Sequence, residues 1–423
     1  MDNWYRLDNA AKIFPAVTKK SNTSVYRVAV RLKENVDPER LQSAAEMALK
    51  RYPLLAVKLR RGVFWNFFDK NESPILIAEE MNYPCSPLVP KQNRGYFLRV
   101  LYYKQQISLE VFHALTDGTG AIEFLKTLLY QYFRLKGKEI DPQGIVLLPG
   151  QVPEQSELDD SFRKYYKPVK KVRVKRQPSF RIVGTPLEPF GNNIVHGVFP
   201  AKALNSHAKS KGATLTEYLT ACLIYAIYLS YLQYGLQKEP VVISVPVNLR
   251  KLFPSKTLRN FFAVANIGAT VDAEIGFDVL LKRVSKEMKA KTSKEALQEI
   301  ISDNVHLERN YGVKFVPLFL KNIVLKQAFN IQGENLKTIT ISNLGNIGFP
   351  ADMAGEIEEV SVILYPTAKS PVNCGMCTFG DRLNISFART IRESDMIFRF
   401  FKLIAEDSGL EPEIYSNDWG FGK

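Results

Sequence analysis

The chain has 423 residues, with 57 lysines and arginines against 43 aspartates and glutamates, so its formal net charge at pH 7 is +14. This length is enough for two or three domains, each with its own hydrophobic core. Hydrophobic residues make up 46% of the chain and charged residues 24%, a composition that excludes a disordered or disulfide-stapled protein. Four cysteines in so long a chain favour a reducing compartment. The positive charge favours anionic partners. It does not show whether such a partner is a nucleic acid, a membrane surface or a phosphorylated small molecule.

Neither a signal peptide nor a membrane-spanning helix is expected. The first residues, MDNWYRLDNAAKIFP, contain no apolar region followed by small residues of a cleavage site. Residues 215–235 are long enough to cross a bilayer, but polar residues such as Glu217 and Gln233 interrupt them, so we expect a buried core helix. The sequence therefore predicts a soluble, cytoplasmic protein.

The first third of the chain alternates strand and helix patterns. Residues 24–33 show the β-branched alternation of a strand, and Asp37 followed by Pro38 predicts the start of a helix over 37–51. Large apolar residues at three- and four-residue spacing predict another helix over 119–136. Further strands are expected at about 55–68, 96–104 and 106–113.

A connector follows this third of the chain. Prolines recur between residues 140 and 190, and the run KYYKPVKKVRVKRQ is strongly basic. We expect an N-terminal lobe of residues 1–145, a basic, proline-rich connector of 146–190 and a C-terminal lobe of 191–423. A solvated connector is favoured over contact of the basic run with phosphate or a carrier.

The second half repeats the alternation, which predicts a two-lobed α/β architecture. The expected strands are 193–200, 240–247, 337–343 and 360–366, with a hairpin of 373–378 and 383–390 whose tip is 379–382. The expected helices are 215–235, 277–303, 314–330 and 394–408.

The segment ISLEVFHALTDGTGAIEFL carries the clearest chemical signal. His113 ends a predicted strand and Asp117 precedes a predicted helix, so the histidine is held rigidly at a turn, as a general base requires. Gly118 and Gly120 lack side chains where a substrate or another backbone needs close approach. The alternative is a structural histidine with Asp117 as a plain N-cap.

HALTDG resembles the His-x-x-x-Asp-Gly motif of the chloramphenicol acetyltransferase-like superfamily, which includes condensation domains, plant BAHD acyltransferases, alcohol acetyltransferases and wax ester synthases. VPVNLRK (245–251), RNFFAV (259–264) and SNLGNIGFP (342–350) are similar to later segments of that family and follow its order. The resemblance covers nearly the whole chain. It implies two similar lobes with the active site at their interface.

The resemblance also implies roles for individual residues. His113 would be the general base that lets an acceptor attack an acyl thioester without an acyl-enzyme. Asp117 would be structural and pair with Arg250, although Arg250 could equally lie exposed. Ser342 and Asn343 are candidate oxyanion donors, with plain turn chemistry as the alternative.

Two features of the sequence differ from particular branches of this superfamily. Phe112 stands where condensation domains carry a second histidine, and the Asp-Phe-Gly-Trp-Gly motif of BAHD enzymes is absent. We therefore expect a monomeric, alcohol acetyltransferase-like enzyme that binds no permanent cofactor and uses acyl-coenzyme A as co-substrate to acylate a small alcohol or amine. One alternative takes the acyl group from a carrier protein. Another, less favoured, is a non-catalytic protein that binds nucleic acid, since only charge supports it.

Other chemistry-bearing residues are discounted. Cys374 and Cys377 form a lone Cys-x-x-Cys in a predicted strand, where a separation of three places the thiols on opposite faces. His196 and His207 are interpreted as structural, and neither a metal site nor a nucleotide-binding glycine motif is expected.

Overall fold

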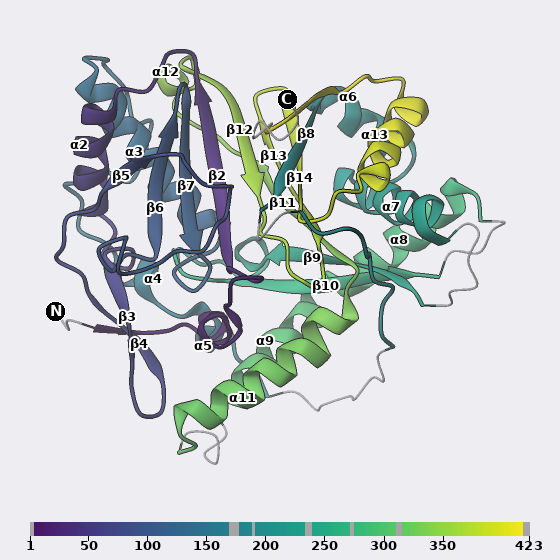
Figure 1. Ribbon diagram of the computed structural model, residues 1–423, viewed down its shortest axis with the longest axis horizontal. Coiled ribbons are helices and arrows are strands. Elements are labelled where there is room, and N and C mark those ends of the chain that lie inside the picture. The colour runs from purple at the N-terminus through teal and green to yellow at the C-terminus, as the bar shows by residue number, and fades with distance from the viewer. Residues whose placement is uncertain are drawn as a thin grey trace.

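The computed structural model describes residues 4–168, 177–187, 191–232, 239–270, 275–309 and 315–417. Figure 1 shows two α/β halves side by side, each with its own sheet and helices. Each half also has its own cluster of buried apolar residues. The predicted α/β fold with two lobes is confirmed.

The sheet of the first half has the strand order β12-β2-β7-β6-β5, and helices α2 and α3 pack together against it. The helix α2 begins as predicted, because the Asp37 side chain accepts a hydrogen bond from the Arg40 amide at 3.1 Å and Pro38 occupies the first turn. The bounds are β2 (Val25–Leu32), β5 (Ile77–Glu79), β6 (Leu98–Tyr103), β7 (Gln106–Phe112), β12 (Ile357–Ile363), α1 (Phe14–Val17), α2 (Pro38–Leu49) and α3 (Gly118–Leu135).

A small sheet of order β1-β4-β3 accompanies this half; its strands are β1 (Trp4–Arg6), β3 (Val57–Arg61) and β4 (Asn66–Lys70). The single strand expected over 55–68 is therefore wrong. Gly62 donates its amide hydrogen to the Trp65 carbonyl at 3.0 Å, which closes a turn and folds the segment into a hairpin.

The second half is built on a sheet of order β10-β9-β11-β13-β14-β8-β15. Its helix α7 is buried between neighbours that include α8 and α13, so the apolar stretch is a core helix, as predicted. Together with the π-helical turn Tyr228–Leu232 that continues it, α7 is also the one helix in the described part of the chain that is long and apolar enough to cross a membrane. The strands are β8 (Asn193–Pro200), β9 (Val241–Asn248), β10 (Phe262–Ala269), β11 (Ile339–Asn346), β13 (Val372–Phe379), β14 (Arg382–Arg389) and β15 (Glu413–Ser416). The helices are α6 (Ala201–Ser210), α7 (Leu215–Ile227), α8 (Phe277–Lys291), α9 (Lys294–Arg309), α11 (Leu318–Ala328), α12 (Ala351–Ala354) and α13 (Asp395–Ser408).

The helix expected over 277–303 is two helices. Thr292 is the C-cap of α8, and the Ser293 hydroxyl accepts a hydrogen bond from the Ala296 amide at 3.2 Å in the first turn of α9. A residue that ends one helix is thus followed directly by one that caps the next. Buried apolar residues recur at four-residue spacing on both sides of the break, at Leu280, Val284 and Met288 and again at Leu297, Ile301 and Val305, so both segments have the pattern of a helix.

One strand crosses between the halves. Although β12 lies at residues 357–363, it pairs antiparallel with β2 in the sheet of the first half. The expected boundary near residue 191 therefore does not separate the two sheets. Strand β13 packs between the two cores, since Cys377 belongs to the first buried cluster and Cys374 to the second. This matches the opposite faces predicted for the two thiols.

The connector contains two short helices, α4 (Gln155–Leu158) and α5 (Ser161–Lys164). Most of its basic run, residues 169–176, lies outside the described residues, as do residues 188–190. The suggested contact between the basic run and phosphate or a carrier thus falls mainly on residues that the structure does not describe.

Candidate active site

His113 lies directly after β7, at the junction of the two halves. Its amide donates a hydrogen bond to the Ser24 carbonyl at 2.8 Å, which fixes the backbone at the end of the strand. Its ring stacks on Phe14, with ring centroids 4.7 Å apart, and packs against Tyr26 from β2 and Phe262 from β10 at 5.0 and 5.2 Å. The side chain is half-buried and enclosed by aromatic rings.

The orientation of the imidazole is set by Asn260. The His113 Nδ1 is 3.1 Å from Asn260 Oδ1, and Asn260 Nδ2 donates to the carboxylate of buried Asp8 at 3.1 Å. Because the amide nitrogen of Asn260 is used by Asp8, its oxygen faces His113 and accepts the Nδ1 hydrogen. The tautomer this favours leaves the Nε2 lone pair available to accept a proton.

Enclosure by the aromatic rings also changes the acidity of His113. Burial lowers its pKa below the ordinary value of 6.5, while the Asp117 charge and the hydrogen bond to Asn260 act in the opposite direction. The imidazole is therefore neutral at pH 7. A neutral, oriented imidazole has the protonation state that a general base needs.

Asp117 supports the turn that follows His113. Its side chain accepts hydrogen bonds from the amides of Thr119 and Gly120 at 3.1 and 3.4 Å, so it is the N-cap of α3. It also accepts from the Phe261 amide at 2.9 Å. The carboxylate thus joins the turn after His113 to the segment before β10 that carries Asn260.

Arg250 completes this cluster. Its guanidinium forms a bidentate pair with Asp117, with nitrogen–oxygen distances of 2.8 and 3.2 Å. It also donates to the carbonyls of Thr257 and Arg259, the latter at 2.6 Å. The side chain of Arg250 is only 10% exposed, so the alternative of an exposed arginine is excluded. Asp117 and Arg250 together clamp residues 257–261 against the turn.

The two glycines after Asp117 make room for the second half of the chain. A Cβ atom on Gly118 would lie 2.7 Å from the Leu344 side chain of β11, and one on Gly120 would collide with the Leu258 carbonyl. The close approach predicted at these glycines is thus packing between halves. A part for Gly118 in substrate access stays a prediction.

Ser342 and Asn343 lie on β11, just before the leucine that contacts Gly118. Ser342 is buried. The Asn343 amide donates to the Thr216 hydroxyl at 3.1 Å, and its oxygen accepts from the Gly345 amide at 2.8 Å. Asn343 therefore also has the local turn role considered for it, and the oxyanion role of both residues stays a prediction.

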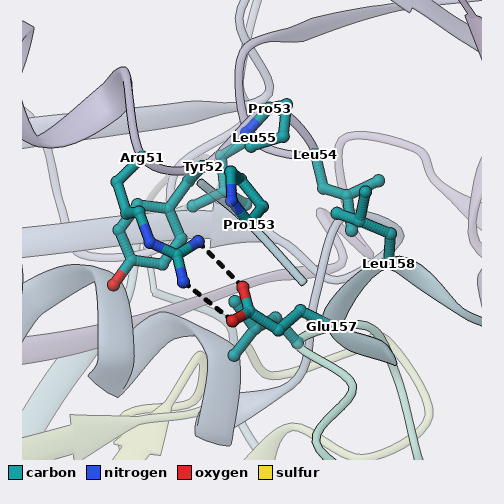
Figure 2. Close-up of a pocket in the computed structure, with 9 residues that line it drawn as sticks. Arg51, Tyr52, Pro53, Leu54, Leu55, Pro153, Glu157 and Leu158 are labelled. Atoms are coloured by element: carbon teal, nitrogen blue, oxygen red, sulfur yellow. Dashed lines mark hydrogen bonds and ion pairs between the residues drawn. The ribbon is translucent and has the colours of Figure 1, made fainter. Parts of the chain in front are cut away.

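A small pocket borders this region on the side of α4. Figure 2 shows its lining, in which Arg51 and Glu157 form a buried bidentate pair with distances of 2.8 and 2.7 Å, surrounded by prolines and leucines. The Leu258 amide in its wall donates to the Glu157 carbonyl, and the Leu258 carbonyl accepts from the Thr116 hydroxyl in the turn after His113. The pocket wall thus supports the turn from behind.

The remaining histidines and cysteines have structural environments. His196 is buried, hydrogen-bonded to the Ser386 hydroxyl at 2.8 Å, and burial lowers its pKa to about 4. His207 pairs with Asp407 at 2.6 Å. Within the described ranges, no group of histidines, cysteines and carboxylates has the arrangement of a metal site.

Sequence reasoning missed Asn260 and Asp8. The segment RNFFAV was noted as similar to a family segment, yet nothing local showed that its asparagine contacts a histidine 147 residues earlier. Asp8 lies in a stretch without any motif. Only the three-dimensional structure brings these residues to His113.

The sequence matches no known family and no curated protein. Its structure is similar to that of TRI101 from F. graminearum complexed with coenzyme A and T-2 mycotoxin, with a TM-score of 0.64, 11% identity and coverage of 97% of this chain and 99% of that chain. It is also similar to polyketide synthase associated protein 5 from Mycobacterium tuberculosis (TM-score 0.59, 14% identity, 96% and 97% coverage). The first condensation domain of the CDA synthetase gives a TM-score of 0.60 at 13% identity, with 96% of each chain covered. The chain therefore shares the two-lobed fold of these three proteins, which is the fold that the family resemblance predicted.

Proposed function

We propose that the protein is an acyltransferase that moves an acyl group from a thioester to a hydroxyl or amine. The observation that carries the proposal is His113, which is neutral, oriented through Nδ1 by Asn260 and located where the two halves meet. The structural neighbours include the trichothecene 15-O-acetyltransferase TRI3, TRI101 complexed with coenzyme A, and a condensation domain, which supports this reaction class.

In the proposed reaction, the Nε2 atom of His113 takes the proton of the acceptor while the acceptor oxygen or nitrogen attacks the thioester carbonyl. The resulting tetrahedral oxyanion collapses and expels the thiolate. The imidazolium returns its proton to the leaving sulfur, so the products are the ester or amide and a free thiol. Ser342 and Asn343 remain our candidates for donors to the oxyanion.

Coenzyme A is the donor we favour. The formal charge of +14 suits a donor that carries phosphates, and TRI101 is one of the neighbours that binds coenzyme A. Phe112, in place of a second histidine, weighs against peptide-bond formation. An acyl carrier protein as donor is the second candidate, supported by the similarity to a condensation domain.

The four cysteines are free, which agrees with the cytoplasmic location that we propose.

The decisive experiment measures free-thiol release with a panel of acyl-coenzyme A donors and of alcohol and amine acceptors. We expect acceptor-dependent thiol release by the wild type and a loss of about 10²–10⁴-fold in His113→Ala, with thermal stability nearly unchanged. His306→Ala, on the exposed surface of α9, is the matched control and should keep full activity. Wild-type turnover in His113→Ala would refute the catalytic assignment. Steeply salt-dependent binding of DNA or RNA without thiol release would favour the nucleic-acid alternative.

A further inference from the structure

Helix α11 buries a lysine and exposes apolar side chains, which is the reverse of an ordinary surface helix. Its Lys321 is only 4% exposed, stacks over the Trp65 ring with its nitrogen 3.5 Å from the ring centroid, and donates to the Phe64 carbonyl at 3.0 Å. On the opposite side, Phe319 and Ile323 are 66% and 55% exposed. A surface helix normally buries its apolar stripe and exposes its lysines. This helix therefore offers its apolar side to a partner.

The tip of the β3–β4 hairpin extends this exposed apolar surface. The Leu318 amide donates to the Val63 carbonyl at 2.9 Å, which fixes the first turn of α11 to the hairpin. In Figure 1 both elements lie at the lower edge of the molecule and project away from the sheets. We use the name apolar ridge for six exposed residues at the hairpin tip, on α11 and just before α11: Val63, Phe64, Phe315, Phe319, Ile323 and Val324.

The elements that carry the apolar ridge have an excess of basic residues. Residues 315–333 contain two lysines and neither aspartate nor glutamate. The hairpin strands β3 and β4 contain Lys58, Arg60, Arg61 and Lys70 against one acidic residue, Asp69, which pairs with Arg60 at 3.1 Å. Arg61 on the hairpin and Lys326 on α11 are exposed. The surface combines large apolar side chains with a net positive charge, which is complementary to an anionic apolar partner.

We infer that the apolar ridge inserts into the interface of an anionic lipid bilayer and docks the protein on a membrane surface. The six exposed side chains come from the hairpin tip and from α11 with the residues just before it, at one edge of the molecule. A fluid lipid surface can close around such projections, whereas a protein partner would need a matching groove. Because α11 packs on α1, whose Phe14 stacks on His113, the docked edge also lies on the side of the candidate active site.

The test is cosedimentation of the full-length protein with vesicles at physiological salt. We expect binding to phosphatidylcholine vesicles that contain about one-third phosphatidylserine, and about tenfold weaker binding to phosphatidylcholine alone. The double variant Phe319→Ser/Ile323→Ser should bind the anionic vesicles at least about tenfold more weakly. The matched control is Phe398→Ser/Val279→Ser, which removes similarly exposed apolar residues from α13 and α8 and should bind like the wild type.

Failure of the wild type to bind vesicles, or equal binding by the two double variants, would overturn the inference. It would also be overturned by a dimer, or a complex with an acidic carrier protein, that needs Phe319 and Ile323 while vesicles are not bound. The inference is independent of the acyltransferase proposal, because His113→Ala should bind vesicles like the wild type.

Discussion

Among the buried arginine–carboxylate pairs of the described residues, Arg250–Asp117 and Arg51–Glu157 have similar geometry. Both are bidentate, and none of the four side chains is more than 10% exposed. Both join segments that are more than 100 residues apart in the sequence. By distance and burial alone they would be judged equivalent.

Their surroundings differ. Asp117 also accepts three backbone amide hydrogens, and Arg250 also donates to carbonyls of the segment that leads to Asn260. The Arg51–Glu157 pair has mostly prolines and leucines around it, as Figure 2 shows. The comparison teaches that an ion pair acts on the chemistry of a site through the backbone groups that it holds. The Arg51–Glu157 pair lies one step further from His113, because it reaches the turn only through the Glu157 carbonyl, which accepts from the Leu258 amide.

Asp117→Asn should have the largest effect. It leaves Arg250 buried without its carboxylate, which costs about 3–5 kcal/mol of unfolding free energy, and it loosens the turn that carries His113. We expect stability and thiol release to fall together, measured by urea unfolding and by the acyltransfer assay. A stable variant that merely turns over slowly would show instead that Asp117 acts next to the substrate.

Arg51→Ala should separate stability from activity. Removing one partner of this buried pair should cost a similar 3–5 kcal/mol, roughly, while kcat measured below the unfolding temperature stays unchanged. The double variant Arg51→Met/Glu157→Leu should recover most of the lost stability, because it removes both charges. A drop in kcat in this double variant would mean that the two pairs do not differ as we conclude.

Asn260→Ala should change activity more than stability, although it deprives Asp8 of one hydrogen bond. Loss of the partner of Nδ1 should lower kcat by roughly tenfold, since the imidazole is no longer held in one orientation. The hydrogen bond to Asn260 raises the pKa of His113, so the acid limb of the kcat/KM profile should shift to lower pH in this variant. If the variant had the same kcat and the same pH profile as the wild type, Asn260 would have a purely structural role.

The smallest expected effect concerns the wild type, namely the pH at which its kcat/KM falls on the acid side of the profile. Burial lowers the pKa of His113, so the basic form persists to lower pH than for a free histidine, and kcat/KM should fall only below pH 6.5. The pH dependence of thiol release between about pH 5 and 8 measures this. A midpoint above 6.5 would contradict the enclosure of His113 that the structure shows.

Local patterns were sufficient for much of the fold. The predicted strand 193–200 has the bounds of β8, and the helix predicted at 119–136 is shifted by a single residue from α3. These elements carry strong periodicity or clear caps. Strand β10 was not predicted, because FAVANIGA mixes small, polar and apolar residues without a clear alternation.

The candidate site likewise combines residues that a local pattern identifies with contacts that no local pattern identifies. His113 and Asp117 lie within the six consecutive residues of one motif, HALTDG, so a local pattern identifies both of them. The pairing of Asp117 with Arg250 came only from the family resemblance. The contact of His113 with Asn260 spans 147 residues and depends on how two sheets pack, which no local pattern encodes.

The crossing of β12 into the first sheet has a consequence for biosynthesis. Until residue 363 has left the ribosome, β2 lacks its outer neighbour and presents a bare edge of unpaired amides and carbonyls. The N-terminal lobe therefore cannot complete its sheet as a separate folding unit during translation, and a fragment that ends at the connector would be prone to aggregate through β2.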